Sequence, residues 1–125
     1  MISIIIPTYN NDTIGRAIDS ILIQKNSHQE IIVIDDSIDN KIQQTIRDIN
    51  HPDIKYYKNT KNLGTTLSRI KGIQTAQGDY IGFLDDDDLM INNNLEKKLK
   101  KINEGEIDFV FCDYIINNSI ENIIT

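Results

Sequence analysis

Four consecutive carboxylates, Asp85-Asp86-Asp87-Asp88, follow directly on the apolar stretch 80–84. An apolar run of this length, preceded by Gly78-Asp79, predicts a buried strand with the acids at its carboxyl end. Two like charges about 4 Å apart repel by about 4 kcal/mol at an effective dielectric of about 20. Carboxylates are hard oxygen ligands, suited to Mg²⁺ or Mn²⁺ that also holds a phosphate. The run therefore predicts a divalent-cation site at a strand end.

Three other interpretations of the acid run fit less well. An EF-hand loop that starts at Asp85 has Glu96 at its twelfth position, but Leu89 and Met90 occupy the fifth and sixth, where a ligand and a glycine are needed. A phosphatase that uses a strand followed by Asp-x-Asp needs a basic residue and more acids on later strands, and little chain follows Asp88. A solvated acidic cap on the next helix is disfavoured because an apolar strand leads straight into the run.

Composition limits the class of protein. The chain has 125 residues and a net charge of −6, which predicts one domain and no nucleic-acid partner, because nucleic-acid binders carry a basic face. It has no run of 18 apolar residues and no signal-peptide pattern, so no integral membrane span is expected. The single cysteine, Cys112, lies in the apolar run 109–112, which predicts a buried structural thiol and a reducing, cytoplasmic compartment.

Strand-like and helix-like segments alternate along the chain. Apolar stretches predict strands at residues 3–7, 30–35, 54–58, 80–84 and 108–114. Helical spacing of apolar residues predicts helices at residues 14–22 (capped by Asp12 or Thr13), 39–49, 65–75 and 94–103. In the third helix, Leu67, Ile70 and Ile73 are expected to point inward. Apolar strands between helices predict a Rossmann-like three-layer α/β sandwich around a mostly parallel sheet.

Polar clusters follow four of the predicted strands at their carboxyl ends. In a parallel sheet these ends lie along one edge, where ligands bind. The convergence therefore predicts one ligand site built from several loops. The clusters are Pro7-Thr8-Tyr9-Asn10, Asp35-Asp36-Ser37, Asn59 with Asn62-Leu63-Gly64, and the acid run.

The loop after the first strand lacks the glycine pattern of a dinucleotide site or a P-loop. Tyr9 can pack along a nucleobase and Thr8 can hydrogen-bond base or ribose, although Tyr9 and Asn10 also fit a simple turn. The pair Asp35 and Asp36 can accept hydrogen bonds from ribose hydroxyls or a base N–H.

Two alternatives concern the charged residues of this edge. Asp35 and Asp36 could simply favour a helix N-terminus, but Ser37 and Asp39 already serve that role, so a ligand is the better interpretation. Arg69, four residues after Thr65 on the third helix, can reach a base or phosphates, whereas a single helical arginine is usually solvated.

Six blocks of this sequence together resemble the family 2 glycosyltransferases of the GT-A fold, over residues 2–115. The blocks are residues 3–10, 30–37, 62–64, Arg69, 71–73 and 78–88. The resemblance implies a nucleotide-sugar donor, most often a UDP-sugar, and inverting transfer to an acceptor hydroxyl in polysaccharide biosynthesis. It implies that Asp85-x-Asp87 is the D-x-D motif, in which Asp85 contacts the ribose side of the nucleotide and Asp87 binds the Mn²⁺ or Mg²⁺ that bridges the diphosphate. The other donor-binding positions that it implies are Pro7, Thr8, Tyr9, Asp36, Arg69 and Asp86.

The chain departs from the family pattern at two places. Ile70 stands where the family often has asparagine, and nothing after Tyr114 matches the acceptor-binding half that carries the general base. We therefore expect residues 1–116 to be the nucleotide-sugar-binding half of a GT-A domain. Residues 117–125, with the lone acid Glu121, would be a tail or the start of the acceptor half.

No catalytic residue is assigned from the sequence. A trimmed chain, a truncated gene product and a degenerate paralogue all fit this pattern. An apolar patch left open on such a half-domain would favour self-association. The acceptor would be a carbohydrate or a lipid-linked sugar. The alternative function is a non-catalytic nucleotide-sugar-binding module or a truncated remnant.

Overall fold

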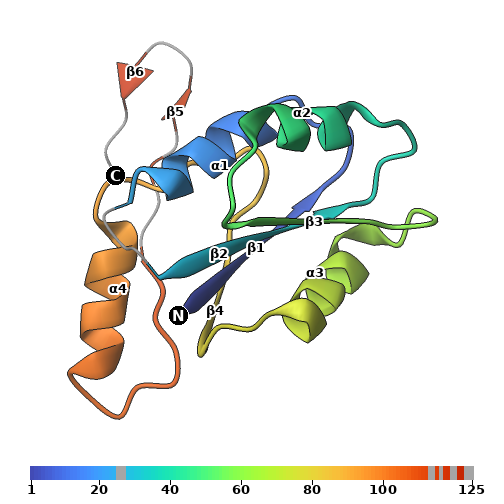
Figure 1. Ribbon diagram of the computed structural model, residues 1–125. Coiled ribbons are helices and arrows are strands. Elements are labelled where there is room, and N and C mark those ends of the chain that lie inside the picture. Colours follow the sequence, from blue (N-terminus) through green and yellow to red (C-terminus); the bar gives the residue numbers. More distant parts are fainter. Residues whose placement is uncertain (25–27, 113–114, 116, 119–120, 123–125) are drawn as a thin grey trace.

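The computed structural model describes residues 1–24, 28–112, 115, 117–118 and 121–122. Four parallel strands form the central sheet, in the order β3-β2-β1-β4 (Figure 1). This confirms the predicted α/β fold with its parallel sheet. The strands are β1 (Ile2–Thr8), β2 (Gln29–Asp35), β3 (Ile54–Lys58) and β4 (Tyr80–Phe83), with a separate antiparallel pair, β5 (Asn117–Asn118) and β6 (Glu121–Asn122).

Helices cover both faces of the sheet (Figure 1). They are α1 (Ile14–Leu22), α2 (Lys41–Ile49), α3 (Gly64–Thr75) and α4 (Asn94–Asn103). Helices α1 and α2 lie on one face and α3 lies on the other. None of the helices formed by the described residues is both long and apolar enough to cross a membrane.

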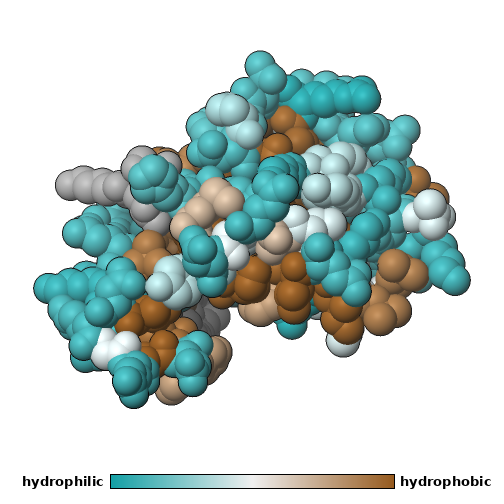
Figure 2. Space-filling view, turned by 60° about the horizontal axis from the view of Figure 1, so that its bottom comes forward, coloured by the Kyte–Doolittle hydropathy of each residue, from teal (hydrophilic) through white to brown (hydrophobic). Residues whose placement is uncertain are grey.

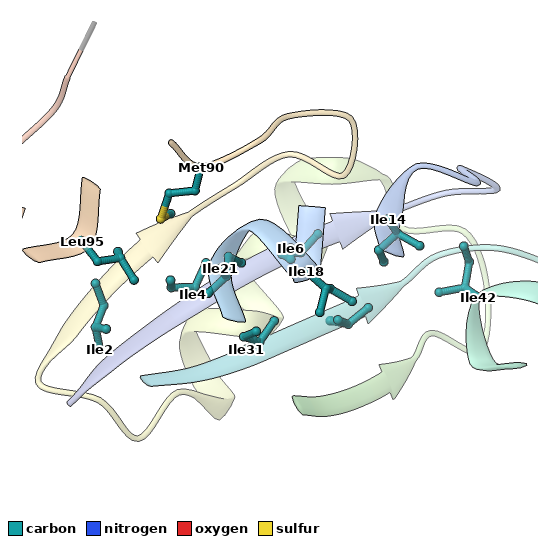
Figure 3. Close-up of a cluster of buried hydrophobic side chains, with 11 residues drawn as sticks. Ile2, Ile4, Ile6, Ile14, Ile18, Ile21, Ile31, Ile42, Met90 and Leu95 are labelled. Carbon is teal, nitrogen blue, oxygen red and sulfur yellow. The ribbon is translucent and has the colours of Figure 1, made fainter. Parts of the chain in front are cut away.

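The main hydrophobic core lies between the sheet and helices α1, α2 and α4. It buries the isoleucine-rich side of β1 and β2, the inner face of α1, and single residues of α2 and α4 (Figure 3). The β-branched residues suit strands because they fit the pleated surface of a sheet. The buried members are Ile2, Ile4, Ile6, Ile14, Ile18, Ile21, Ile31, Val33, Ile42, Met90 and Leu95.

The opposite core, under α3, is much smaller and holds Ile5, Ile32 and Ile34. Helix α3 lies close to the sheet because Gly72 faces Ile5: a Cβ at Gly72 would be 2.4 Å from Ile5 Cγ2. A side chain at this position could fit only if the helix or the Ile5 side chain moved. The close approach holds the N-terminal end of α3 at the carboxyl edge of the sheet.

The expected inward face of α3 was wrong. Leu67, Ile70 and Ile73 have exposed fractions of 51%, 44% and 47%, whereas Ser68 and Gly72 are buried. Residues four apart share one helix face, and these two are small enough for close contact with the strands. The larger side chains are left on the outer surface of the helix.

The predicted strand at 108–114 was also wrong. Residues 108–112 form no strand, and residues 113–114 lie outside the described part of the chain. The rings of Phe109 and Phe111 are 74% and 78% exposed, and Cys112 is exposed too, so the buried structural thiol is not observed. A run of apolar residues forms a strand only where a partner strand accepts its backbone hydrogen bonds, and within the described residues no strand pairs with this segment.

Candidate functional site: a polar cavity at the carboxyl edge of the sheet

A cavity of about 390 Å³ opens at the carboxyl ends of the parallel strands. It is lined by the end of β1, the start of α3 and the loops after β1, β2, β3 and β4. The predicted donor-binding and metal-binding residues lie in its wall, with two exceptions, Arg69 and Asp35. The lining residues are Pro7, Thr8, Tyr9, Asp36, Asn62, Gly64, Thr65, Ser68, Asp85, Asp86 and Asp87.

Asp36 is the buried carboxylate of this cavity. Its oxygens accept three hydrogen bonds of 2.8 Å, from the N–H groups of Leu63 and Gly64 and from Asn59 Nδ2. Burial by itself would raise the pKa of Asp36, but these hydrogen bonds and the charge of Lys71 bring it below the ordinary value. Asp36 is therefore an ionised acceptor that faces the cavity.

The loop that donates to Asp36 depends on two local features. Gly64 has φ +80°, a left-handed conformation that glycine adopts without strain, and it starts α3 with its N–H turned to the carboxylate. Lys71 Nζ donates to Asn59 Oδ1 at 2.7 Å, which orients the amide so that its nitrogen reaches Asp36. The N-terminal end of α3 is thus fixed against the end of β2.

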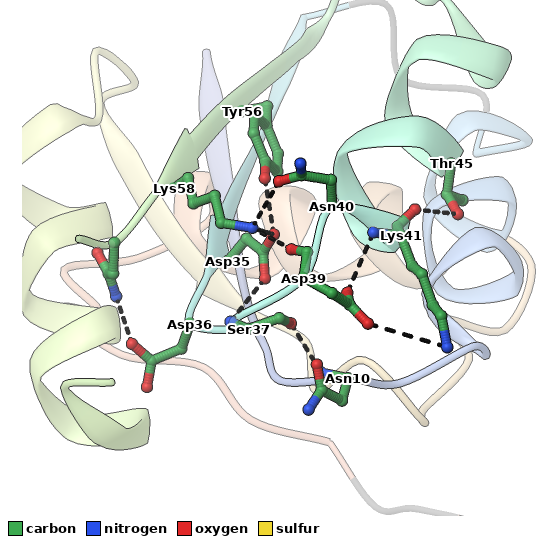
Figure 4. A network of polar contacts seen from close by, with 11 residues as sticks. Asn10, Asp35, Asp36, Ser37, Asp39, Asn40, Lys41, Thr45, Tyr56 and Lys58 are labelled. Atoms are coloured by element: carbon green, nitrogen blue, oxygen red, sulfur yellow. Dashed lines mark hydrogen bonds and ion pairs between the residues drawn. The ribbon is translucent and has the colours of Figure 1, made fainter. Parts of the chain in front are cut away.

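Asp35, the neighbour of Asp36, points to the other side of the sheet (Figure 4). It is fully buried, and it accepts Tyr56 Oη at 2.6 Å and Ser37 N–H at 2.9 Å, with Lys58 Nζ 3.7 Å away. It does not line the cavity. The expected ligand pair is therefore divided, since Asp36 faces the cavity and Asp35 joins β2 to β3.

Thr8 and Tyr9 contribute the wall from β1. Thr8 is 4% exposed, and its Oγ1 has no hydrogen-bond partner among the described residues. A buried hydroxyl without a partner is costly, so a ligand that offers one would gain from it. Tyr9 is half exposed, which leaves its ring open to solvent beside the cavity.

The acid run forms a turn after β4, closed by the Asp88 N–H to the Asp85 carbonyl at 3.1 Å. Asp85 Oδ1 lies 2.5 Å from Arg69 Nη2, and Asp86 Oδ1 accepts Asn11 Nδ2 at 2.8 Å. Burial, followed by the charges of Asp87 and Asp85, raises the pKa of Asp88. Asp87 makes no hydrogen bond or ion pair with any described residue. Of the three residues of the acid run that line the cavity, Asp87 is therefore the one whose carboxylate has no protein partner among the described residues.

Arg69 lies beside the cavity and outside its wall. Its guanidinium is paired with Asp85 and lies over the Phe83 ring, with its carbon 5.8 Å from the ring centroid. Both partners of the ion pair are well exposed, so the pair by itself adds little stability. Arg69 thus acts on the cavity through Asp85.

Some contacts of the site were not anticipated from the sequence. Asn11 and Lys71 were assigned no role, Thr13 was expected only as a helix cap, and Asn59 was noted only as a polar residue after β3. Each is a common polar residue in a loop or on a helix, and no spacing marks it. Only folding of the chain brings Asn11 to Asp86, which is 75 positions away in sequence.

The residues present fit a cation that is bound jointly by the protein and by the phosphates of a ligand. Within the described residues, no group of three or more His, Cys, Asp or Glu is arranged to hold a metal. Mg²⁺ is usually bound by one or two carboxylates together with substrate phosphates and water. Asp87, uncommitted at the cavity, suits such a shared site, and the cavity offers no closed cage for an ion alone.

A parallel sheet with a polar cavity at its carboxyl edge defines the class of Rossmann-like α/β folds, in which ligands bind at that edge. Solved glycosyltransferases of the GT-A type share this fold. One is the mannosyltransferase PcManGT from Pyrobaculum calidifontis, in complex with GDP-Man and Mn²⁺. It matches with a TM-score of 0.72 and 25% identity over 79% of this chain and 31% of its own.

The chain belongs to glycosyl transferase family 2, whose family model matches residues 3–124. A Haemophilus influenzae protein described as an uncharacterized glycosyltransferase is 35% identical, over 100% of this chain and 53% of its own length. The Escherichia coli enzyme UDP-Glc:alpha-D-GlcNAc-diphosphoundecaprenol beta-1,3-glucosyltransferase WfgD is 33% identical, over 95% of this chain and 48% of its own. The chain thus spans about half the length of these curated relatives.

Proposed function

We propose that this chain is the donor-binding part of a metal-dependent, inverting glycosyltransferase that uses a nucleotide diphosphate sugar. The observation that carries the proposal is a single cavity with three complementary groups: the ionised Asp36, the unpartnered hydroxyl of Thr8 and the uncommitted carboxylate of Asp87. The names of two similar proteins support it, since one includes a UDP-Glc donor and the other was solved with GDP-Man and Mn²⁺.

The nucleoside would bind between the loops after β1 and β2. Asp36 accepts three protein donors, and the Leu63 N–H is shared between its two oxygens, at 2.8 and 3.0 Å. A carboxylate has about four acceptor positions, so a base N–H would take the position of the longer Leu63 contact. Uracil and guanine both offer such an N–H. We propose uridine as the preferred nucleoside, with Thr8 bonded to base or ribose, and Tyr9 stacked along the base and flanked by Pro7.

The diphosphate would lie toward the acid turn. Asp87 would hold Mn²⁺ or Mg²⁺ there, and the ion would neutralise charge on the leaving diphosphate. Asp85 would contact the ribose side and Asp86 would lie between the two. For Asp85 to bind the ribose, its ion pair with Arg69 must loosen, which is inexpensive because the pair is exposed.

Sugar transfer also needs an acceptor and a general base. The carboxylates of the cavity wall are already assigned to the nucleotide and the metal, so none of them is proposed as the base. We propose that this chain alone binds donor without transferring sugar, and that the acceptor is a carbohydrate or a lipid-linked sugar. The alternative function is a non-catalytic nucleotide-sugar-binding module. The cytoplasmic location expected from the single cysteine stays a prediction.

An exposed apolar surface beside the site gives a second element of the proposal. Ile81 and Phe83 of β4 are 40% and 48% exposed, and they lie on the same side of the sheet as the exposed Leu67, Ile70 and Ile73 of α3. Apolar side chains are visible on this side of the molecule (Figure 2). We propose that this surface favours self-association of the chain, together with the outer edge of β4, which pairs with no other strand among the described residues.

Thermal unfolding with nucleotide and metal tests the proposed function. We expect UDP with Mn²⁺ to raise the melting temperature and either component alone to do less, because only the pair fills both parts of the cavity. At a ligand concentration about 100 times Kd, the free energy of unfolding rises by about 2.7 kcal/mol. A larger rise in melting temperature with GDP than with UDP would change the proposed base to guanine and leave the proposed class of donor, a nucleotide diphosphate sugar, unchanged. A melt that no nucleoside diphosphate moves, with Mn²⁺ at millimolar concentrations, would refute the proposal.

A further inference from the structure

Two residues of the loop between β1 and α1, Asn11 and Thr13, hold the acid turn at Asp86. Asn11 Nδ2 donates to Asp86 Oδ1 at 2.8 Å, and Thr13 Oγ1 lies 2.7 Å from the Asp86 carbonyl oxygen. Asn11 Oδ1 in turn accepts the Thr13 N–H at 3.1 Å and lies 2.8 Å from the Thr13 hydroxyl. The three residues thus form one hydrogen-bonded unit, which we call the Asn11–Thr13 strap.

Thr13 is not used as the sequence predicts. It directly precedes α1, where a threonine side chain usually accepts a backbone N–H of the first turn, yet its side chain makes no such bond. Its hydroxyl is turned to the acid run instead. The Thr13 side chain therefore bonds Asp86 in place of the helix N-terminus.

The acid turn needs an anchor on this side. The last hydrogen bond between β4 and the sheet joins Leu84 N–H to the Ile5 carbonyl at 3.1 Å. Beyond it, four neighbouring carboxylates repel one another, and toward α3 the turn is held by the exposed pair of Arg69 and Asp85, which is a weak restraint. The strap is part-buried and fixes both the side chain and the main chain of Asp86.

The strap also continues toward the nucleoside side of the cavity. Asn10, next to Asn11, has φ +48°, and its N–H donates to Ser37 Oγ in the loop after β2 at 2.8 Å (Figure 4). Thr8 and Tyr9, which line the cavity, precede it in the same loop. One short segment therefore connects the loop after β2, the nucleoside wall and the acid turn.

We propose that Asn11 and Thr13 are positioning residues that hold the acid turn so that Asp87 faces the cavity, and thereby couple nucleoside binding to metal binding. The inference rests on the proposed function, because it assigns a role in presenting Asp87. With Asp86 fixed by the strap, the next side chain along the turn is left free of protein partners. Without the strap, the turn would keep its connection to β4 but lose its orientation.

Substitution of Thr13 tests the strap without touching a cavity residue. Thr13→Val removes the hydroxyl and keeps the shape, Thr13→Ser keeps the hydroxyl, and Asn11→Ala removes the second anchor. Thr45→Val is the matched control, because Thr45 Oγ1 also bonds a backbone carbonyl, that of Lys41, on an exposed helix away from the cavity. Two measurements are made on each variant: ¹⁵N relaxation of the free protein, and nucleotide affinity with and without Mn²⁺.

In the free protein we expect the amide order parameters of Asp86 and Asp87 to fall in Thr13→Val and Asn11→Ala, from about 0.85 toward about 0.6. They should stay unchanged in Thr13→Ser and Thr45→Val. The gain in UDP affinity on adding Mn²⁺ should drop about 10–100-fold in the first two variants, the range seen when a residue that orients a metal ligand is lost. Affinity for UMP without metal should not change.

Unchanged order parameters at the acid turn in both Thr13→Val and Asn11→Ala would overturn the strap, whatever the nucleotide does. A full Mn²⁺ effect in both variants would overturn the coupling. Wild-type protein that binds UDP equally with and without Mn²⁺ would contradict the proposed metal site instead, and the relaxation measurement would still decide on the strap.

Discussion

Two buried carboxylates, Asp36 and Glu30, bind the two ends of helix α3, and they differ in whether a positive charge lies beside them. At the carboxyl end of β2, Asp36 accepts the N–H groups of Leu63 and Gly64, where α3 begins. At the other end of the strand, Glu30 Oε1 accepts the N–H of Gln77, just after α3 ends, at 2.6 Å. Both carboxylates have a pKa below the ordinary value although burial opposes it.

The difference lies in the counter-charge. Glu30 Oε2 is 2.5 Å from Lys55 Nζ, and its other oxygen also accepts Ser3 Oγ, so its environment is closed. Asp36 has no ammonium group in direct contact within the described residues, because Lys71 reaches it through Asn59. It opens on the cavity. The same chemistry therefore gives a closed ion pair at one end of α3 and a carboxylate open to the cavity at the other.

The largest effect on stability should come from Glu30→Gln. It removes the charge that Lys55 pairs with and puts an amide N–H among donors, so we expect a loss of about 3 kcal/mol in the free energy of unfolding, near the lower end for a broken buried pair. Lys55 is partly exposed, which limits the cost. Urea unfolding measures it, with the exposed Glu96→Gln as control. UDP affinity of the folded fraction should not change, and a weakened affinity would contradict the division between the two ends.

Asp36→Asn should cost somewhat less stability, about 1–3 kcal/mol, because one oxygen still accepts a hydrogen bond while the amide nitrogen faces the N–H donors. It should also weaken UDP at least tenfold. Asp35→Asn is the matched control, since Asp35 is also a buried carboxylate but faces Tyr56 and Lys58 and not the cavity. Urea unfolding and titration calorimetry should show that Asp35→Asn loses stability and keeps UDP affinity. Equal UDP losses in both variants would mean that Asp36 only supports the fold.

The pH dependence of stability should be smaller than either substitution effect near neutral pH and grow in acid. A carboxyl whose folded pKa is lowered stabilises the protein above its unfolded pKa, and that contribution is lost as pH falls through the folded value. For Glu30 and Asp36 the ordinary values are 4.5 and 3.8, so the loss should begin near these values and continue below them. Unfolding curves from pH 7 to 3 measure it. In Glu30→Gln the free energy of unfolding should fall less steeply between pH 5 and 3 than in the wild type. An equally steep fall would contradict the role given to Glu30.

Much of the fold could be predicted from the sequence because the patterns of β1, β2 and α1 are strong. The division of Asp35 and Asp36 was also within reach: successive strand side chains point to opposite faces, with Ile31 and Val33 in one core and Ile32 and Ile34 in the other. Continuing that alternation places Asp35 and Asp36 on opposite sides.

Other features could not be predicted from periodicity. Helix α3 packs through Ser68 and Gly72, so its contact face is chosen by close approach and not by its largest apolar residues. The segment 108–112 has a strand-like pattern, but a strand also needs a partner with free hydrogen-bonding groups. The Asn11–Thr13 strap depends on residues that are ordinary in any loop, and only the folded chain brings them to Asp86.

Titration calorimetry of UDP into the wild-type protein, with and without Mn²⁺, and into two variants tests the central claim most directly. Asp87→Asn removes the uncommitted carboxylate of the cavity, and Asp88→Asn removes the next acid, which does not line it. We predict that Mn²⁺ strengthens UDP binding in the wild type and in Asp88→Asn, and that Asp87→Asn abolishes this gain. Equal losses in the two variants, or no Mn²⁺ effect in the wild type, would contradict an ordered metal and diphosphate site at this edge of the sheet.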